Sequence, residues 1–188
     1  MPTQLSNVAV AILATDGFEQ AELLEPKKAL EEAGATVHVV SPESGQIKGW
    51  DEDDWGRSVP VDKTLADADA ADYAALVLPG GQINPDKLRI DDDALDFVRA
   101  FASAGKPVAA ICHAPWLLVE TGLARGRRLT SYTSIRTDLR NAGATVVDEP
   151  VVRDEDGPFV LVTSRNPDDL PDFNGAIVDV LATAGQPA

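Results

Sequence analysis

Cys112 and His113 stand next to each other in the stretch "KPVAAICHAPW", residues 106–116. Cys112 is the only cysteine of the chain, and His113 is one of its two histidines. A thiol beside an imidazole can act as a nucleophile with its base. The apolar run before Cys112 predicts a buried strand and the residues after it predict a helix, so the cysteine would occupy a strand-to-helix nucleophile elbow. Amides at the start of that helix would favour a thiolate, and the His113 N–H would be one oxyanion donor.

Cys112 also has a purely structural interpretation, as a small buried side chain without chemical function. The elbow position and the adjacent His113 favour the nucleophile. So does the turn Pro79-Gly80-Gly81, because glycine lets a backbone amide come close to a reacting oxygen.

The elements that position this pair follow from the pattern of apolar runs. Continuous runs predict strands at 8–14, 35–41, 73–78 and 108–111, and shorter strands at 129–131, 145–147, 151–153 and 159–163. Helices are predicted at 19–34, 91–104, 113–121, 135–142 and 167–184, and Pro26 should kink the first or mark its true start. Residues 42–62 fit a small hairpin excursion. The alternation predicts one α/β domain over residues 1–188, with a doubly wound, mostly parallel sheet.

Ligands of such sheets bind at the carboxyl ends of the strands. Glu19 and Glu22 follow the first strand, and Gly80, Gly81 and Asp86 follow the third. Glu19 and Glu22 share one face of a helix. Either they are ordinary acids at a helix start, or one of them turns inward and hydrogen-bonds the Cys112 sulfur with a raised pKa.

Composition excludes several classes of function. With 31 acidic and 16 basic residues the net charge is −15, which disfavours nucleic acids and anionic membranes as partners. A single cysteine cannot form an internal disulfide, and neither a signal peptide nor a membrane-spanning apolar run is apparent. We therefore expect a cytoplasmic protein.

The remaining polar clusters predict neither metal nor cofactor. His38 lies inside an apolar run and is expected to be a hydrogen-bonded sheet residue, too far from Cys112 for a metal site. The run Asp51–Asp54 is expected to be a solvated loop, with Trp50 and Trp55 packed beneath the hairpin. The run Arg125–Arg128 is expected to be a solvated turn or an intersubunit patch. No G-x-G-x-x-G follows the first strand, so a phosphate-bearing cofactor is not expected either.

Five segments together resemble one known family: "FEQAELLEP", "LVLPGGQINPDKLR", "AICHAPWLL", "GLARGRRLTSY" and "LVTSRNPDDLPDF". The chain resembles the PfpI-type intracellular proteases and stress proteins of the ThiJ/PfpI superfamily, which are class I glutamine amidotransferase-like, from about Val8 to the last helix. The resemblance implies a flavodoxin-like sheet with helices on both faces and a homodimer or a larger ring of dimers.

The same resemblance implies roles for individual residues. Cys112 would be the nucleophile and His113 its partner, and the acid that orients His113 would be Asp86 of a neighbouring subunit. Glu22 would be the inward acid, with Glu19 kept as a second candidate. Substrate would lie against Gly80, Gly81 and Tyr132, with Gly81 as the oxyanion glycine.

Two functions are consistent with these residues. One is a cysteine-dependent hydrolase of the peptidase, glyoxalase or deglycase type, in which a thiolate attacks the carbonyl of a small substrate or short peptide, or a glycated adduct. The alternative is a non-enzymatic redox-sensing stress protein or chaperone with an oxidisable Cys112. Hydrolysis needs His113 and its orienting group, whereas sensing needs only the sulfur, and the presence of both His113 and Asp86 favours the enzyme.

Overall fold

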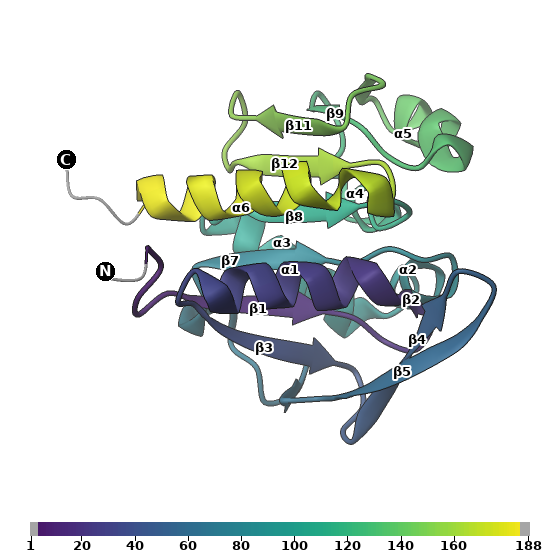
Figure 1. The fold of residues 1–188 in the computed structure, drawn as a ribbon. Coiled ribbons are helices and arrows are strands. Elements are labelled where there is room, and N and C mark those ends of the chain that lie inside the picture. Colours follow the sequence, from purple (N-terminus) through teal and green to yellow (C-terminus); the bar gives the residue numbers. More distant parts are fainter. Residues whose placement is uncertain (1–3, 185–188) are drawn as a thin grey trace.

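The central sheet of the computed structural model, which describes residues 4–184, has seven strands in the order β11-β12-β8-β7-β1-β3-β6 (Figure 1). All neighbouring strands are parallel except the pair β11–β12. This confirms the mostly parallel α/β sheet. The strands are β1 (Ala9–Leu13), β3 (Thr36–Ser41), β6 (Lys63–Thr64), β7 (Ala75–Leu78), β8 (Val108–Ile111), β11 (Val151–Asp154) and β12 (Leu161–Ser164).

Helices cover both faces of this sheet because alternate residues of each strand point to opposite sides. Ala11 and Leu13 of β1 belong to one apolar core, and Val10 and Ile12 to the other. The first core lies beneath α3 (Asp92–Ser103), α4 (Trp116–Glu120) and α5 (Arg136–Asn141). The second lies beneath α1 (Gln20–Glu32) and α6 (Leu170–Ala184), which pack side by side. Short 3-10 turns η1 (Ala70–Asp72), η2 (Thr133–Ile135) and η3 (Pro167–Asp169) join the elements.

A second, three-stranded sheet stands at the carboxyl edge of the main sheet (Figure 1). Its strands β4 (Gln46–Asp51) and β5 (Asp54–Pro60) form the predicted hairpin. The strand β2 (Phe18–Glu19) pairs in parallel with β4, which the sequence did not predict because a two-residue strand leaves no periodic pattern. The hairpin is thereby attached to the start of α1. Another short parallel pair joins β9 (Arg128–Leu129) to β10 (Thr145–Val146).

The helices differ from the predicted ones in detail. Pro26 lies in the middle of α1, so of its two predicted effects it does not mark the start of the helix, and its missing N–H leaves the Glu22 carbonyl without the usual helical donor. The helix α4 begins at Trp116 and not at His113, because residues 112–115 form a turn. The helix α2 (Ile83–Leu88) was not predicted at all.

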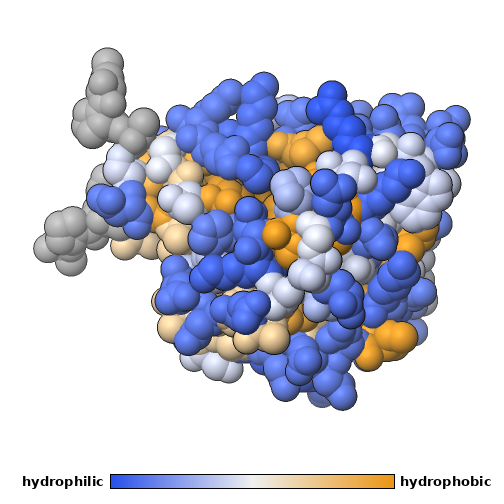
Figure 2. Space-filling view, turned by 90° about the horizontal axis from the view of Figure 1, so that it is seen from below, coloured by the Kyte–Doolittle hydropathy of each residue, from blue (hydrophilic) through white to orange (hydrophobic). Residues whose placement is uncertain are grey.

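Hydrophilic residues cover most of the face shown in Figure 2, and hydrophobic ones appear there in separate patches. Within residues 4–184, no helix has the length and apolar character needed to cross a membrane. His38 lies in the sheet as expected, with its Nδ1 3.0 Å from the Tyr73 hydroxyl.

Candidate active site

Cys112 is held in a backbone conformation that few residues other than glycine adopt. Its φ is +64°, directly after the last residue of β8. Its N–H donates to the Ser164 carbonyl at 3.0 Å, and its own carbonyl accepts from the Tyr132 N–H at 2.9 Å. Strained backbone that is held in this way by neighbouring strands is frequent at reactive side chains. The structure therefore forms the elbow that the sequence predicts.

The imidazole of His113 bridges the sulfur and a hydroxyl group of the same chain. Its Nδ1 lies 3.1 Å from the Cys112 Sγ, and its Nε2 lies 3.1 Å from the Ser134 Oγ. In a neutral imidazole only one nitrogen carries hydrogen. If Nε2–H donates to Ser134, the lone pair of Nδ1 faces the thiol, which is the arrangement a general base needs.

Two aromatic rings hold this imidazole in place. Tyr132 stacks on it with the ring centroids 4.6 Å apart, and Trp116 meets it edge-on at 5.2 Å. Burial lowers the pKa of His113, so the ring is neutral near pH 7 and can accept a proton from the thiol.

Glu22 is a buried acid beside the sulfur. Its side chain is fully inaccessible, and its Oε2 accepts a hydrogen bond from the Gly80 N–H at 2.9 Å. Burial, followed by the charge of Glu19, raises the pKa of Glu22 to about 8, and a hydrogen bond between the Glu22 and Cys112 side chains acts in the opposite direction. Glu22 is thus protonated near pH 7 and can donate to sulfur. Of the two acids in the first helical segment, Glu22 is the one in contact with Cys112.

Backbone amides favour the thiolate as predicted, but burial acts against them. Burial raises the pKa of the Cys112 thiol, although the backbone amides of Gly81 and His113 hydrogen-bond to the sulfur and lower it. The predicted helix-terminal stabilisation is weak because α4 begins only at Trp116 and has five residues. The sulfur therefore depends on His113 to take its proton when it attacks.

Replacing Glu22 by glutamine is expected to change how stability depends on pH. Folded Glu22 keeps its proton to about pH 8, but an unfolded glutamate loses it near 4.5. Wild type should therefore lose stability as pH rises between these values, by about 1.4 kcal/mol per unit of pKa shift. The substituted glutamine cannot ionise and still accepts from Gly80. Urea unfolding at about pH 5, 7 and 9 gives the free energies of unfolding. The value for Glu22→Gln relative to wild type should increase with pH, whereas the value for the exposed control Glu25→Gln should not. A difference between Glu22→Gln and wild type that is independent of pH would contradict the buried-acid assignment.

The sulfur, the imidazole and Glu22 line one cavity of about 450 Å³. Gly81 and Tyr132 also line it, as the sequence predicts, and so does Glu19. Gly81 has a φ of +83°, and a Cβ there would come within 2.7 Å of the backbone of the β2 segment, so only glycine fits. The cavity lining consists of Gly17, Glu19, Glu22, Trp50, Glu52, Gly81, Gln82, Ile83, Cys112, His113, Tyr132 and Pro167.

Two predicted site residues lie outside this lining. Gly80 stands behind it, where its N–H is used by Glu22. Asp86 is exposed on α2, away from the cavity lining of its own chain. The oxyanion donors that remain are the amides of Gly81 and His113.

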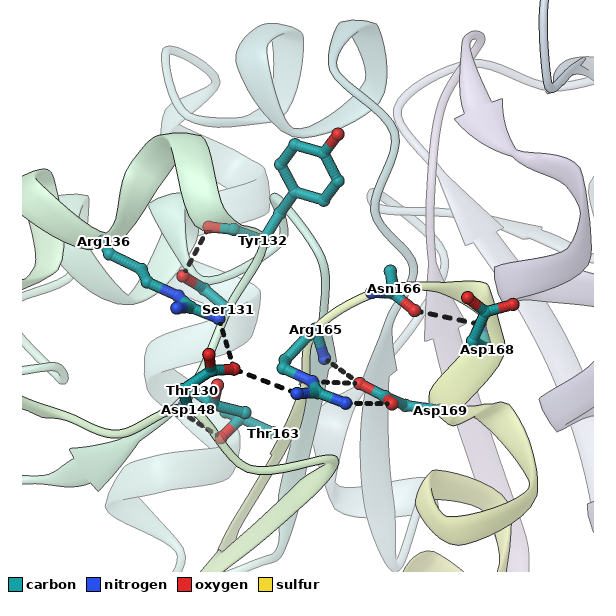
Figure 3. A network of polar contacts seen from close by, with 10 residues as sticks. All are labelled: Thr130, Ser131, Tyr132, Arg136, Asp148, Thr163, Arg165, Asn166, Asp168 and Asp169. Atoms are coloured by element: carbon teal, nitrogen blue, oxygen red, sulfur yellow. Dashed lines mark hydrogen bonds and ion pairs between the residues drawn. The ribbon is translucent and has the colours of Figure 1, made fainter.

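An ion-pair network braces the cavity wall formed by Tyr132 and Pro167. Arg165 binds Asp169 through two nitrogens and also contacts Asp148, which in turn binds Arg136 at 2.9 Å. Figure 3 shows Asp148 between the two arginines, with the Tyr132 ring pointing away from them. The network ties η3, which holds Pro167, to the segment that follows Tyr132.

Comparison with known proteins agrees with this arrangement. The family model described as "DJ-1/PfpI family" matches residues 8–180. The chain belongs to the DJ-1/PfpI family. This confirms the resemblance that the five sequence segments carry.

Similar DJ-1/PfpI proteins carry several functional names. YraA of Bacillus subtilis, named provisionally as a cysteine protease, is 44% identical over 173 residues, which are 92% of this chain and 97% of YraA. "Protein/nucleic acid deglycase 2" of Escherichia coli is 43% identical over 166 residues, 88% of this chain and 92% of that protein. The crystal structure of Drosophila melanogaster DJ-1beta superposes with a TM-score of 0.82 and 31% identity, covering 93% of this chain and 90% of the other.

In this DJ-1/PfpI chain, Ser134 is expected to be a positioning residue for His113. Ser134→Ala removes the acceptor of Nε2–H, so the wrong tautomer gains population and kcat should fall about tenfold with little change in KM. The pH–rate profile is the readout that separates this from a structural effect, because its acidic limb should move. Ser134→Thr should restore the rate, and exposed Ser103→Ala should change nothing. An unchanged profile in Ser134→Ala would remove Ser134 from the site.

Sequence reasoning missed Ser134, Trp50 and Glu52. Ser134 is one of several hydroxyl residues in "TSYTS", and no local pattern marks the one that faces the imidazole. Trp50 and Glu52 reach the cavity only because β4 pairs with β2. Trp50 and Trp55 contact each other edge-on at 5.5 Å, but Trp55 is exposed, so the prediction that both pack beneath the hairpin is wrong.

Proposed function

We propose that this protein is a cysteine-dependent hydrolase that attacks the carbonyl carbon of small dicarbonyl compounds or of the adducts they form. The observation that carries the proposal is the 3.1 Å contact between the Cys112 Sγ and the His113 Nδ1 at the wall of a cavity of about 450 Å³. A cavity of this volume suits a small molecule or a short peptide and not a folded protein.

The chemical step follows from the positions of three groups. His113 Nδ1 takes the thiol proton while the sulfur bonds to the aldehyde carbon and the C=O electron pair moves to oxygen. The amides of Gly81 and His113 stabilise that oxygen, which then receives the proton from His113. The ionised form of Glu22, a minority near pH 7 because its pKa is about 8, removes the proton from the former aldehyde carbon and returns it to the ketone carbon. The hydroxyl proton moves to the ketone oxygen at the same time, so the thiohemiacetal becomes its isomer, a thioester. Water then cleaves the thioester to a hydroxy acid and the free thiol, so the dicarbonyl gains one water overall.

Similar proteins support this reaction class without selecting the substrate. One relative is named as a deglycase and another provisionally as a cysteine protease. Attack of sulfur on a carbon bound to oxygen is common to both activities. We retain a peptidase activity on short peptides, and a cytoplasmic location, as parts of the proposal.

A neighbouring subunit is also part of the proposal. Asp86 is exposed and could approach His113 of a second copy in a homodimer or ring of dimers. Light scattering together with Asp86→Asn tests this: a monomer with full activity would remove Asp86 from the site.

Redox sensing by Cys112 is the second candidate. It is favoured by the buried, hydrogen-bonding Glu22 beside the sulfur, which could stabilise an oxidised sulfur by donating to it. Sensing does not require His113 to transfer protons. Retention of function by His113→Ala therefore separates it from hydrolysis.

The decisive experiment follows methylglyoxal consumption, lactate release and peptide cleavage in wild type, Cys112→Ala and His113→Ala. The buffer contains no metal and no free thiol, because a thiol alone binds methylglyoxal. We expect lactate to equal the dicarbonyl consumed in wild type and to fall to the background in both variants. Consumption without lactate, together with stoichiometric Cys112 oxidation, would replace the hydrolase with the sensor.

A further inference from the structure

We propose that the cavity beside Cys112 contains a subsite for an organic cation, an ammonium or guanidinium group of the substrate, formed by Glu19, Glu52 and Trp50. The inference rests on the proposed function in one respect: the molecule that carries the cation is the one whose carbonyl Cys112 attacks. It adds a preference for positively charged substrates and assigns this preference to the small sheet formed by β2, β4 and β5.

The carboxylates of this subsite are not neutralised by the described part of the protein. Glu19 in β2 and Glu52 in the turn between β4 and β5 both line the cavity, and the Glu52 N–H lies 3.4 Å from the Glu19 Oε1. Among the described residues, no lysine or arginine lines the cavity. The ion pairs within residues 4–184 all use other carboxylates.

The cavity therefore presents more acceptors than donors. Glu22 lines the same cavity, and its fully buried Oε1 meets no hydrogen-bond partner at ordinary geometry among the described residues. Burial, together with the charges of Asp51 and Glu52, raises the pKa of Glu19, which is the direction expected of acids crowded without a cation. A ligand that complements this lining brings N–H donors and positive charge.

Trp50 gives the subsite an aromatic wall in a fixed position. Its indole Nε1–H donates to the Glu52 carbonyl at 2.9 Å, and its ring meets Trp55 edge-on at 5.5 Å. An indole face beside carboxylates is a common arrangement for binding ammonium and guanidinium groups. Residues 4–184 contain no group of three or more His, Cys, Asp or Glu side chains placed to hold a metal ion. An indole face beside carboxylates complements an organic cation, because ammonium and guanidinium groups bind both.

Binding of two unreactive probes tests the subsite separately from catalysis. Nα-acetyl-lysinamide and Nα-acetyl-norleucinamide have similar side-chain length, but only the first is cationic. We expect wild type to bind the lysine probe about tenfold more tightly, as expected for one charge-assisted contact, and to lose that preference at high salt. Titration followed by NMR of the indole signals gives both dissociation constants.

Matched variants decide whether the carboxylates of Glu19 and Glu52 cause the preference. Glu19→Gln/Glu52→Gln should bind both probes with the affinity of the norleucine probe. The control Glu25→Gln/Glu43→Gln has the same change in net charge, lies outside the cavity and should retain the preference. Equal binding of the two probes to wild type, or an equal loss in the control, would overturn the subsite. The single variants Glu19→Gln and Glu52→Gln, checked by circular dichroism, provide the answer if the double variant is unfolded.

The outcome is distinguishable from that of the proposed function. Preference for the lysine probe without Cys112-dependent lactate release would leave the subsite standing and remove the hydrolase. Cys112-dependent lactate release without that preference would support the hydrolase and remove the subsite.

Discussion

Gly80→Ala is expected to abolish turnover and to destabilise the fold, although it adds one methyl group. A Cβ at Gly80 would lie 2.5 Å from the Glu22 Oε2, 2.6 Å from the Cys112 Cβ and 2.7 Å from the Ile111 carbonyl oxygen. Neither the Ile111 carbonyl nor the Cys112 backbone can move away from the added methyl group without displacing the sulfur. Overpacking of this kind costs about 1–3 kcal/mol, and displacement of reacting groups by about 1 Å costs roughly 100-fold in rate.

The natural control for this substitution is Gly175→Ala in α6. A Cβ at Gly175 meets no atom of the described residues within 4 Å, so alanine should stabilise the helix by about 0.5–1 kcal/mol and leave turnover unchanged. Urea unfolding and lactate release, normalised to the folded fraction at low temperature, measure both effects. Wild-type activity in folded Gly80→Ala would show that Glu22 and Cys112 can move apart without loss of rate. That result would contradict the assignment of Glu22 as a proton donor or acceptor in the reaction at Cys112.

The sequence predicted the site residues whose placement depends only on where a strand ends. Cys112, His113 and Gly81 were predicted to meet because parallel strands end at one edge of a sheet, and the structure places all three on the same cavity. The choice between Glu19 and Glu22 needed the structure. Both lie on one face of the helical segment, and only packing decides which of them turns inward.

Contacts between segments far apart in the chain could not be predicted. Glu52 was expected in a solvated loop and Trp50 beneath the hairpin, because the charge run Asp51–Asp54 hides the pairing of β4 with β2. The effect of burial on the Cys112 pKa could not be predicted for a related reason. The sequence does not show how completely the elbow is buried, nor that α4 starts only after Pro115.

Arg127 is the clearest case, and its replacement is expected to have the largest effect on stability. The run Arg125–Arg128 was expected to be a solvated turn or an intersubunit patch. Within this chain, however, the Arg127 side chain is 6% exposed and its Nε lies 3.0 Å from the Oδ2 of Asp154, which is itself 4% exposed. Its Nη2 donates to the carbonyls of Asp154 and Phe159 at 3.1 and 2.8 Å. Arg127→Ala would leave a buried carboxylate without its cation, which costs about 3–5 kcal/mol.

Arg128→Ala, one residue further along, is the matched control for Arg127→Ala. Arg128 pairs with Glu149 on the surface, where both side chains are nearly half exposed, so its loss should cost about 0–1 kcal/mol. Urea unfolding of both variants gives the two free energies. Because the penalty in Arg127→Ala comes from the uncompensated charge, Arg127→Met/Asp154→Asn should recover part of it. If Arg127→Ala and Arg128→Ala lost equal stability, Asp154 would have to reach solvent in the absence of Arg127, and the pair would be a surface contact in energetic terms.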